Sequence, residues 1–202
     1  MKSSPVKTII IMVLIVGGLI AAFIFVSSKD RSGKAAEKIE DQASQEMTAV
    51  QKLIAEAPYR DYPATPVQVV KYYNEFTAAF YNEKYSDEEL MSIARLSRGL
   101  FDEELKATQS DVDYLVALKS DIDTFKAGNI TVYNSVVSSS TDVDYFTHKG
   151  FECARLYCTY TLKSGTVYQA SKEVYILRKD ADGHWKIFGF DIVTGEDVEG
   201  NG

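Results

Sequence analysis

Two runs decide the fold of this 202-residue chain: Phe151-Glu-Cys-Ala-Arg-Leu-Tyr-Cys-Thr-Tyr-Thr-Leu-Lys163 and Thr166-Val-Tyr-Gln-Ala-Ser-Lys-Glu-Val-Tyr-Ile-Leu-Arg-Lys179. Both are rich in the β-branched and aromatic residues that favour strands. Only Ser164-Gly165 separates them, and two residues of this kind suit a tight hairpin turn. The runs therefore predict an antiparallel hairpin.

Strand-forming sequence continues on both sides of this hairpin. We expect strands over 130–139 and 184–193, the second joined through the turn Asp180-Ala-Asp-Gly183. Upstream, apolar residues recur at helical spacing over 66–81, 86–99 and 110–126, with a short helical turn over 100–105. Thr65-Pro66 and the capping box Ser86-Asp-Glu-Glu89 are good helix starts. This order predicts an α+β fold, with three helices packed on a curved antiparallel sheet.

Three features resemble the nuclear-transport-factor-like (cystatin-like) α+β cone superfamily: the Thr65-Pro66 start, the helix end Phe80-Tyr81-Asn82, and the closing strand with Gly183, Trp185, Lys186 and Ile187. The likeness covers about 63–193. It implies a cone fold whose outer sheet face commonly forms dimers, but the superfamily includes enzymes, carriers and scaffolds. The phrase Leu177-Arg-Lys-Asp-x-Asp-Gly183 also resembles single-span, membrane-anchored proteins of Gram-positive bacteria.

An uncharged apolar run at 8–28 follows a short tail at 1–7. Its length suits one membrane-spanning helix and exceeds the apolar part of most cleaved signal peptides. Four cations follow the run closely and favour a cytoplasmic domain, whereas the early position after two lysines is typical of a signal-anchor. We expect a single-pass protein of the cell membrane whose C-terminal domain lies outside the cytoplasm.

The rest of the chain divides into three parts. Residues 29–62 are expected to form a juxtamembrane helix, over Ala35 to Ala57, and a proline-rich linker. That helix could be a stalk, a short coiled coil, or a helix lying on the domain. Residues 63–193 form the predicted cone domain, and 194–202 a loose acidic tail.

Composition excludes several classes of partner and site. After the apolar run, 29 acidic residues face 20 basic ones, a net charge of −9, which argues against nucleic acid as a partner. Cys153 and Cys158 point to opposite faces of one strand and are too far apart for a disulfide. His148 and His184 have no partner at ligand spacing, and no catalytic motif stands out. We therefore expect no metal, no cofactor and no enzymatic activity.

The two turns suggest a register for the last three strands, provided that no bulge interrupts them. One face then carries the candidate core: Ala154, Leu156, Cys158, Tyr160, Leu162, Tyr175, Leu177, Phe188 and Phe190. Glu173 falls on this face too, either through an error of register or as a polar group of a pocket. The opposite face is half apolar, which indicates an interface. Its candidate residues are Tyr157, Val174, Ile176, Trp185 and Ile187.

The same register aligns Tyr157, Lys172 and Asp191 in a row across three strands. The functional interpretation is a polar site, with Asp191 as base or anion and Tyr157 as hydrogen-bond donor. The simpler interpretation is a cross-strand salt bridge.

The leading hypothesis is a non-catalytic, membrane-tethered scaffold domain that dimerises or docks a partner through its sheet. Two alternatives stay open. One is a domain that binds or turns over a small ligand inside the cone, and the other is a subunit of a conjugation or secretion apparatus.

Overall fold

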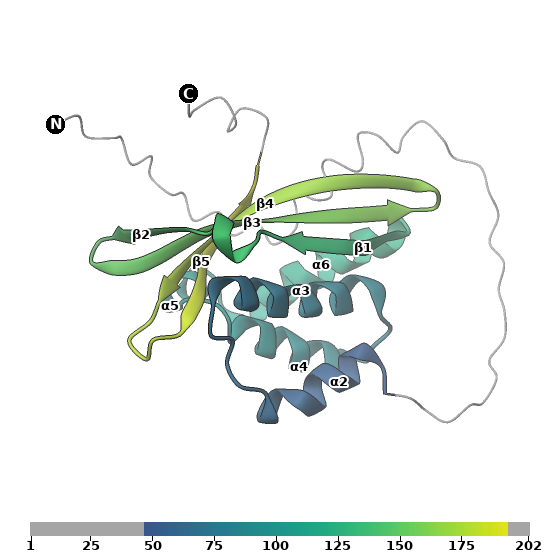
Figure 1. The fold of residues 1–202 in the computed structure, drawn as a ribbon. Coiled ribbons are helices and arrows are strands. Elements are labelled where there is room, and N and C mark those ends of the chain that lie inside the picture. Colours follow the sequence, from purple (N-terminus) through teal and green to yellow (C-terminus); the bar gives the residue numbers. More distant parts are fainter. Residues whose placement is uncertain (1–46, 194–202) are drawn as a thin grey trace.

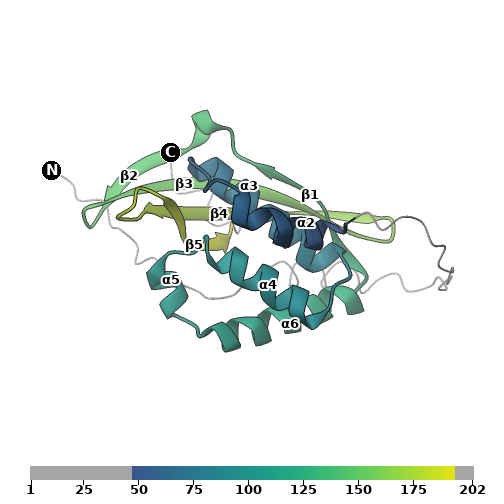
Figure 2. The same ribbon diagram turned by 90° about the horizontal axis from the view of Figure 1, so that it is seen from below.

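The computed structural model describes residues 47–193, which form an α+β domain with a five-stranded antiparallel sheet. The described helices lie on one face of the strongly twisted sheet, as Figure 1 shows. Figure 2, seen from the helical side, shows them spread across that face. Within this part of the chain, no helix combines the length and apolarity needed to cross a bilayer. The apolar run at 8–28 and the tail at 194–202 lie outside the described residues.

Side-chain caps start the three main helices where their sequences predict. α3 (Pro66–Asn82) begins after Thr65, whose hydroxyl accepts from the Gln68 N–H. α4 (Asp87–Arg98) has the complete capping box of Ser86 and Glu89. α6 (Asp111–Ala127) is capped by Ser110. The predicted helices over 66–81, 86–99 and 110–126 are thus confirmed. The expected short turn is α5 (Glu103–Ala107).

The prediction of one helix over Ala35 to Ala57 is wrong in one respect. Thr48 has an extended backbone and caps a separate helix, α2 (Ala49–Glu56), so no helix runs continuously through this residue. A 3₁₀ turn, η1 (Ala57–Tyr59), follows it. Val50 and Leu53 of α2 are buried, and the helix packs on α4 and α3. Of the three alternatives, this segment therefore lies on the domain, on the side away from the outer sheet face; residues 35–46 are outside the described part.

The sheet contains one strand that the sequence analysis did not predict. β1 (Ile130–Val137), β3 (Phe151–Ser164), β4 (Val167–Lys179) and β5 (Trp185–Ile192) lie side by side in that order. The additional strand, β2 (Asp144–His148), follows a 3₁₀ turn, η2 (Ser140–Asp142), and pairs with the first half of β3. Its connection to β3 is Lys149-Gly150, and both residues have positive φ.

The β3–β4 hairpin turns one position later than predicted. Ser164 pairs with Val167, so Gly165-Thr166 forms the turn, and Gly165 has a φ of 59°. Tyr157 consequently faces Val174 in place of Lys172. Each partner moves by two residues, and because side chains alternate with a period of two, both strands keep their predicted faces.

β5 breaks the assumption of a regular register twice. Lys179 pairs with Trp185 where His184 was expected, a shift of one residue that turns Trp185 and Ile187 to the inner face. A bulge follows, in which Ile187 and Gly189 face the consecutive residues Leu177 and Ile176 and Phe188 is the extra residue. After the bulge the side chains return to their predicted faces, with Phe190 inside.

Two assignments are thereby corrected. Trp185 and Ile187, expected at an exposed interface, are buried in the core. Phe188, expected in the core, is half-buried, and its ring lies against the Arg178 guanidinium (4.6 Å). The other predicted core residues, among them Leu156, Tyr160 and Leu177, belong to the buried cluster. Phe190 packs against that cluster from its margin.

Candidate functional site

A buried chain of polar side chains runs from helix α3 to the inner face of β4. The Tyr160 hydroxyl donates to Asn74 Oδ1 (2.5 Å) and lies 2.7 Å from the Tyr175 hydroxyl. The Tyr175 hydroxyl in turn lies 2.9 Å from Glu173 Oε2. At the other end, Asn74 Nδ2 donates to Cys158 Sγ (3.3 Å). The chain thus joins α3, β3 and β4 through hydrogen bonds inside the core.

Burial controls the chemistry of this chain. Glu173 is only 6 % exposed, and desolvation raises the pKa of its carboxyl from 4.5 to about 7. Desolvation also raises the pKa of the Cys158 thiol, to about 11. Glu173 therefore lies on the inner face as the register predicted, with a hydrogen-bonded tyrosine beside it. The thiol of Cys158 stays protonated at neutral pH.

The outer face of the sheet has a hollow that the sequence analysis did not predict. Its volume is about 70 Å³, and it lies where β2, β3, β4 and β5 meet. The lining is mostly apolar and aromatic, with polar and charged groups around it: Phe146, Phe151, Phe188, Cys153, Ile176, Arg178, Glu104, His148 and Lys149. A space of this size accepts a side chain, since pockets for whole small molecules are usually several times larger.

Arg178 forms one wall of the hollow and is held rigidly. Its guanidinium group donates to both carboxylate oxygens of Asp102 (2.9 and 2.5 Å) and to Glu104 (2.7 Å). The rings of Phe151 and Phe188 each lie 4.6 Å from its Cζ. Asp102 is itself buried and caps α5, so the arginine fastens that helix to the sheet.

The predicted polar row is only partly assembled. Lys172 pairs with Thr159, and its ammonium group lies over the Tyr157 ring at 4.3 Å. Asp191 pairs with Val174, which separates it from Tyr157. Within residues 47–193, neither Lys172 nor Asp191 forms an ion pair, so the predicted salt bridge is absent there. All three side chains do lie on the outer face.

Among the predicted interface residues, Tyr157, Val174 and Ile176 also lie on the outer face, where they are half-buried. Cys153 lies on the outer side of β3 and Cys158 on the inner side, and both are free thiols as predicted. In Figure 1 the helices α2, α3, α4 and α6 lie on the opposite side of the sheet. Glu104, at the start of α5, reaches the outer face at the edge of the hollow.

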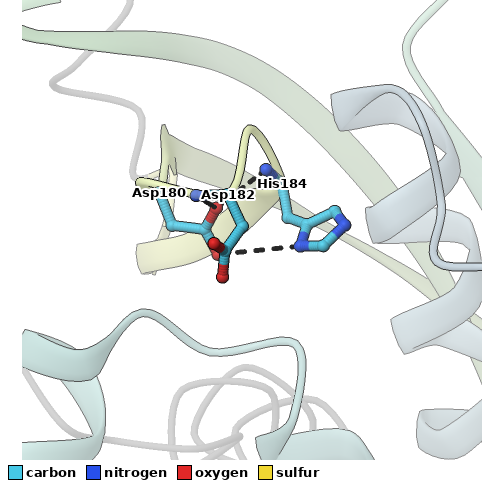
Figure 3. Close-up of side chains that lie close together, drawn as sticks. All are labelled: Asp180, Asp182 and His184. Carbon is cyan, nitrogen blue, oxygen red and sulfur yellow. Dashed lines mark hydrogen bonds and ion pairs between the residues drawn. The ribbon is translucent and has the colours of Figure 1, made fainter.

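The β4–β5 turn brings together three residues that the sequence analysis treated separately. Asp180, Asp182 and His184 place ligand atoms within 4.8 Å of one another. Figure 3 shows the three side chains together at the turn. His184 thus has neighbours at ligand distance, contrary to the expectation from spacing. Asp182 and His184 are exposed, and Asp180 accepts hydrogen bonds from the backbone N–H groups of both. These bonds explain the cluster as a feature of the turn.

Two sequence signals could have found the hollow. Lys149-Gly150 stands between Tyr145-Phe146-Thr147-His148 and Phe151, a tight-turn pattern between strand formers that predicts the β2–β3 hairpin. Gly189, in the middle of an otherwise regular strand, is a frequent mark of a bulge. The pairing of Arg178 with Asp102 joins residues far apart in the chain, and no local pattern indicates it.

One family model matches most of the sequence. A model of the family described as "Domain of unknown function (DUF6715)" matches residues 1–190. The chain belongs to this family. The DUF6715 match includes the apolar run at 8–28 as well as the folded domain. No curated protein matches the sequence.

Proposed function

We propose that this protein is a membrane-tethered, non-catalytic interaction domain that associates with a second copy through its outer sheet face. The observation that carries the proposal is the exposed, half-apolar face around Tyr157, Val174 and Ile176, with an aromatic-lined hollow beside it. Contiguous apolar patches on a soluble surface usually mark interfaces. The resemblance to the cone superfamily, whose members commonly dimerise through this face, agrees with the proposal.

Charge on this face suits a symmetric contact. Lys172 and Asp191 flank the apolar centre from neighbouring strands, and both are exposed. A two-fold axis between two copies places the same patch against itself, so each cation can face the partner's anion. Because neither group forms an ion pair within residues 47–193, both are available for such contacts.

The tether would strengthen a weak contact. The uncharged run at 8–28 suits one membrane span, and an anchored domain meets other anchored copies at a raised effective concentration. We expect the domain to lie outside the cytoplasm because the apolar run comes early in the sequence, as in a signal-anchor. Alkaline carbonate extraction of membranes tests the tether: the full-length chain should stay in the membrane fraction, and release into the supernatant would contradict it.

Site-directed crosslinking tests the contact itself. In lipid vesicles, the full-length Val174→Cys variant should form a disulfide-linked dimer on mild oxidation, because residues near a two-fold axis approach their own copies. Val116→Cys, on the exposed surface of α6, is the matched control. Adding Ile176→Asp to the Val174→Cys variant should reduce the crosslink at least tenfold. Equal crosslinking of the two single variants would contradict the proposed face.

Binding or turnover of a small ligand is a second candidate function, favoured by the convergence of Asn74, Tyr160, Tyr175 and Glu173. These groups, however, already satisfy one another by hydrogen bonds. A ligand would have to displace those bonds, whereas a partner on the outer face displaces only water. The outer face is therefore the better supported site.

A further inference from the structure

The buried polar chain contains three oxygen–oxygen contacts short enough to need a proton each. They join Asn74 Oδ1 to Tyr160, Tyr160 to Tyr175, and Tyr175 to Glu173 Oε2, at 2.5, 2.7 and 2.9 Å. Two buried oxygens at such distances repel each other unless a hydrogen lies between them.

The two tyrosines supply only two of the three protons. Each phenolic hydroxyl has a single hydrogen, and an amide oxygen and an ionised carboxylate have none. If Tyr160 donates to Asn74 and Tyr175 donates to Glu173, the contact between the two hydroxyls contains no hydrogen. A protonated Glu173 supplies the missing one and gives every contact a donor.

We infer that Glu173 binds a proton in the folded protein, so that donation runs in one direction from Glu173 to Tyr175, then Tyr160, then Asn74. This proton site lies inside the core, and it is independent of the docking face proposed above.

Release of the proton from Glu173 requires Asn74, at the other end of this row of hydrogen-bonded side chains, to rearrange. With Glu173 ionised, Tyr175 must donate to the carboxylate and Tyr160 to Tyr175, so Asn74 must offer its amide nitrogen to Tyr160. The amide then turns over and presents its oxygen to Cys158 Sγ, which becomes the donor. Ionisation of Glu173 on β4 is thus coupled to the orientation of Asn74 on α3.

Groups from every neighbouring element act on this proton. Tyr175 lies on the same strand, Cys158 and Tyr160 face Glu173 from β3, and Tyr73 from α3. Asp191 of β5 adds negative charge that disfavours ionisation, whereas a hydrogen bond donated by the Tyr175 hydroxyl to the carboxylate favours it. Desolvation is the largest influence and keeps the carboxyl neutral, in agreement with the proton count.

Infrared spectroscopy of the full-length chain in detergent micelles can detect the proton. A neutral carboxylic acid has a carbonyl band distinct from those of carboxylates and amides. At pH 6 we expect a band of this kind that is absent from Glu173→Gln, and its loss should have a midpoint near pH 7. Asp121, whose pKa is raised by desolvation to about 6, should contribute a separate band that Glu173→Gln leaves unchanged. Glu104→Gln, which changes an exposed carboxyl group, is the matched control and should keep the band.

Different results would support and overturn the inference. A band at pH 6 that disappears only in Glu173→Gln supports the inference. An ionised Glu173 at pH 6, detected as an unshifted carboxyl carbon in nuclear magnetic resonance of glutamate-labelled protein, overturns it. Far-ultraviolet circular dichroism checks that Glu173→Gln is folded, and the resonance measurement on the unsubstituted chain decides the question if it is not. Adding Glu173→Gln to the Val174→Cys variant should leave its crosslinking unchanged. Failure of the proton inference can therefore be told apart from failure of the docking proposal.

Discussion

The two faces of the central sheet are built from the same strands and similar residues, yet they are completed differently. Ile176 and Leu177 are neighbours on β4, and Leu177 is fully buried under the helices while Ile176 is half-buried on the open side. On the inner face, the polar groups of Asn74, Tyr160 and Glu173 bond to one another. On the outer face, Lys172 and Asp191 have no ion-pair partner within residues 47–193. Apolar composition alone therefore does not say which face of a sheet is the core.

The largest expected effect comes from truncating Leu177 to alanine, compared with the same truncation of its neighbour Ile176. Leu177→Ala should reduce the free energy of unfolding by about 4 kcal/mol, because it removes buried methyl groups and leaves a cavity. Ile176→Ala should cost about 1 kcal/mol or less, since its side chain already meets solvent. Urea unfolding followed by circular dichroism measures both. Equal losses would show that the outer face is covered in the intact protein.

Two arginines on the outer face give a second comparison. Arg178→Met should destabilise the domain by about 3 kcal/mol, because it leaves the buried Asp102 carboxylate without its bidentate partner. Arg155→Met is the control. Its ion pair with Asp144 spans 3.6 Å between exposed groups and should contribute about 0.5 kcal/mol or less. Thermal unfolding of the two variants measures the contrast. If Arg178→Met lost as little stability as the control, Arg178 would not be what fastens α5 to the sheet.

The inner face should respond to pH through Glu173. Its pKa is about 7 in the folded chain against 4.5 for a solvated glutamate, so the folded state binds more protons between these values. Stability contributed by this group is therefore complete below about pH 4.5 and is lost as the pH rises through 7, by at most about 3 kcal/mol. Glu173→Gln should lack this loss and be more stable than the unsubstituted chain at pH 8. Denaturant unfolding at pH 5 and pH 8 tests this, and a parallel pH dependence of the two proteins would contradict it.

Local chemistry made most of the fold predictable. Thr65, Ser86 and Ser110 start the three main helices through caps that depend on a few adjacent residues. The faces of β3 and β4 were also correct, because a turn displaced by one position leaves side-chain alternation unchanged.

The errors arose where one residue changes the parity of a strand. A turn one residue longer and the bulge at Phe188 exchanged Trp185 and Ile187 with Phe188 between the two faces. The hollow depends on that exchange of faces and on β2, a short edge strand of only five residues. The ion pair between Asp102 and Arg178 depends on packing between distant segments. Periodicity and spacing along the sequence do not indicate which distant residues lie in contact.

A pair of buried tyrosines gives the smallest expected effect. Tyr81 and Tyr114 are both almost fully buried in helices under the inner face. The Tyr114 hydroxyl lies 3.2 Å from Ser97 Oγ, whereas the Tyr81 hydroxyl has no hydrogen-bond partner among the described residues. Tyr81→Phe should therefore raise the free energy of unfolding by about 1 kcal/mol, because an unpaired buried hydroxyl is costly, and Tyr114→Phe should lower it by a similar amount. Chemical denaturation of both variants gives the sign. A loss of stability on Tyr81→Phe would mean that this hydroxyl has a partner after all, and the comparison of the two faces would then have to include a second satisfied polar site inside the core.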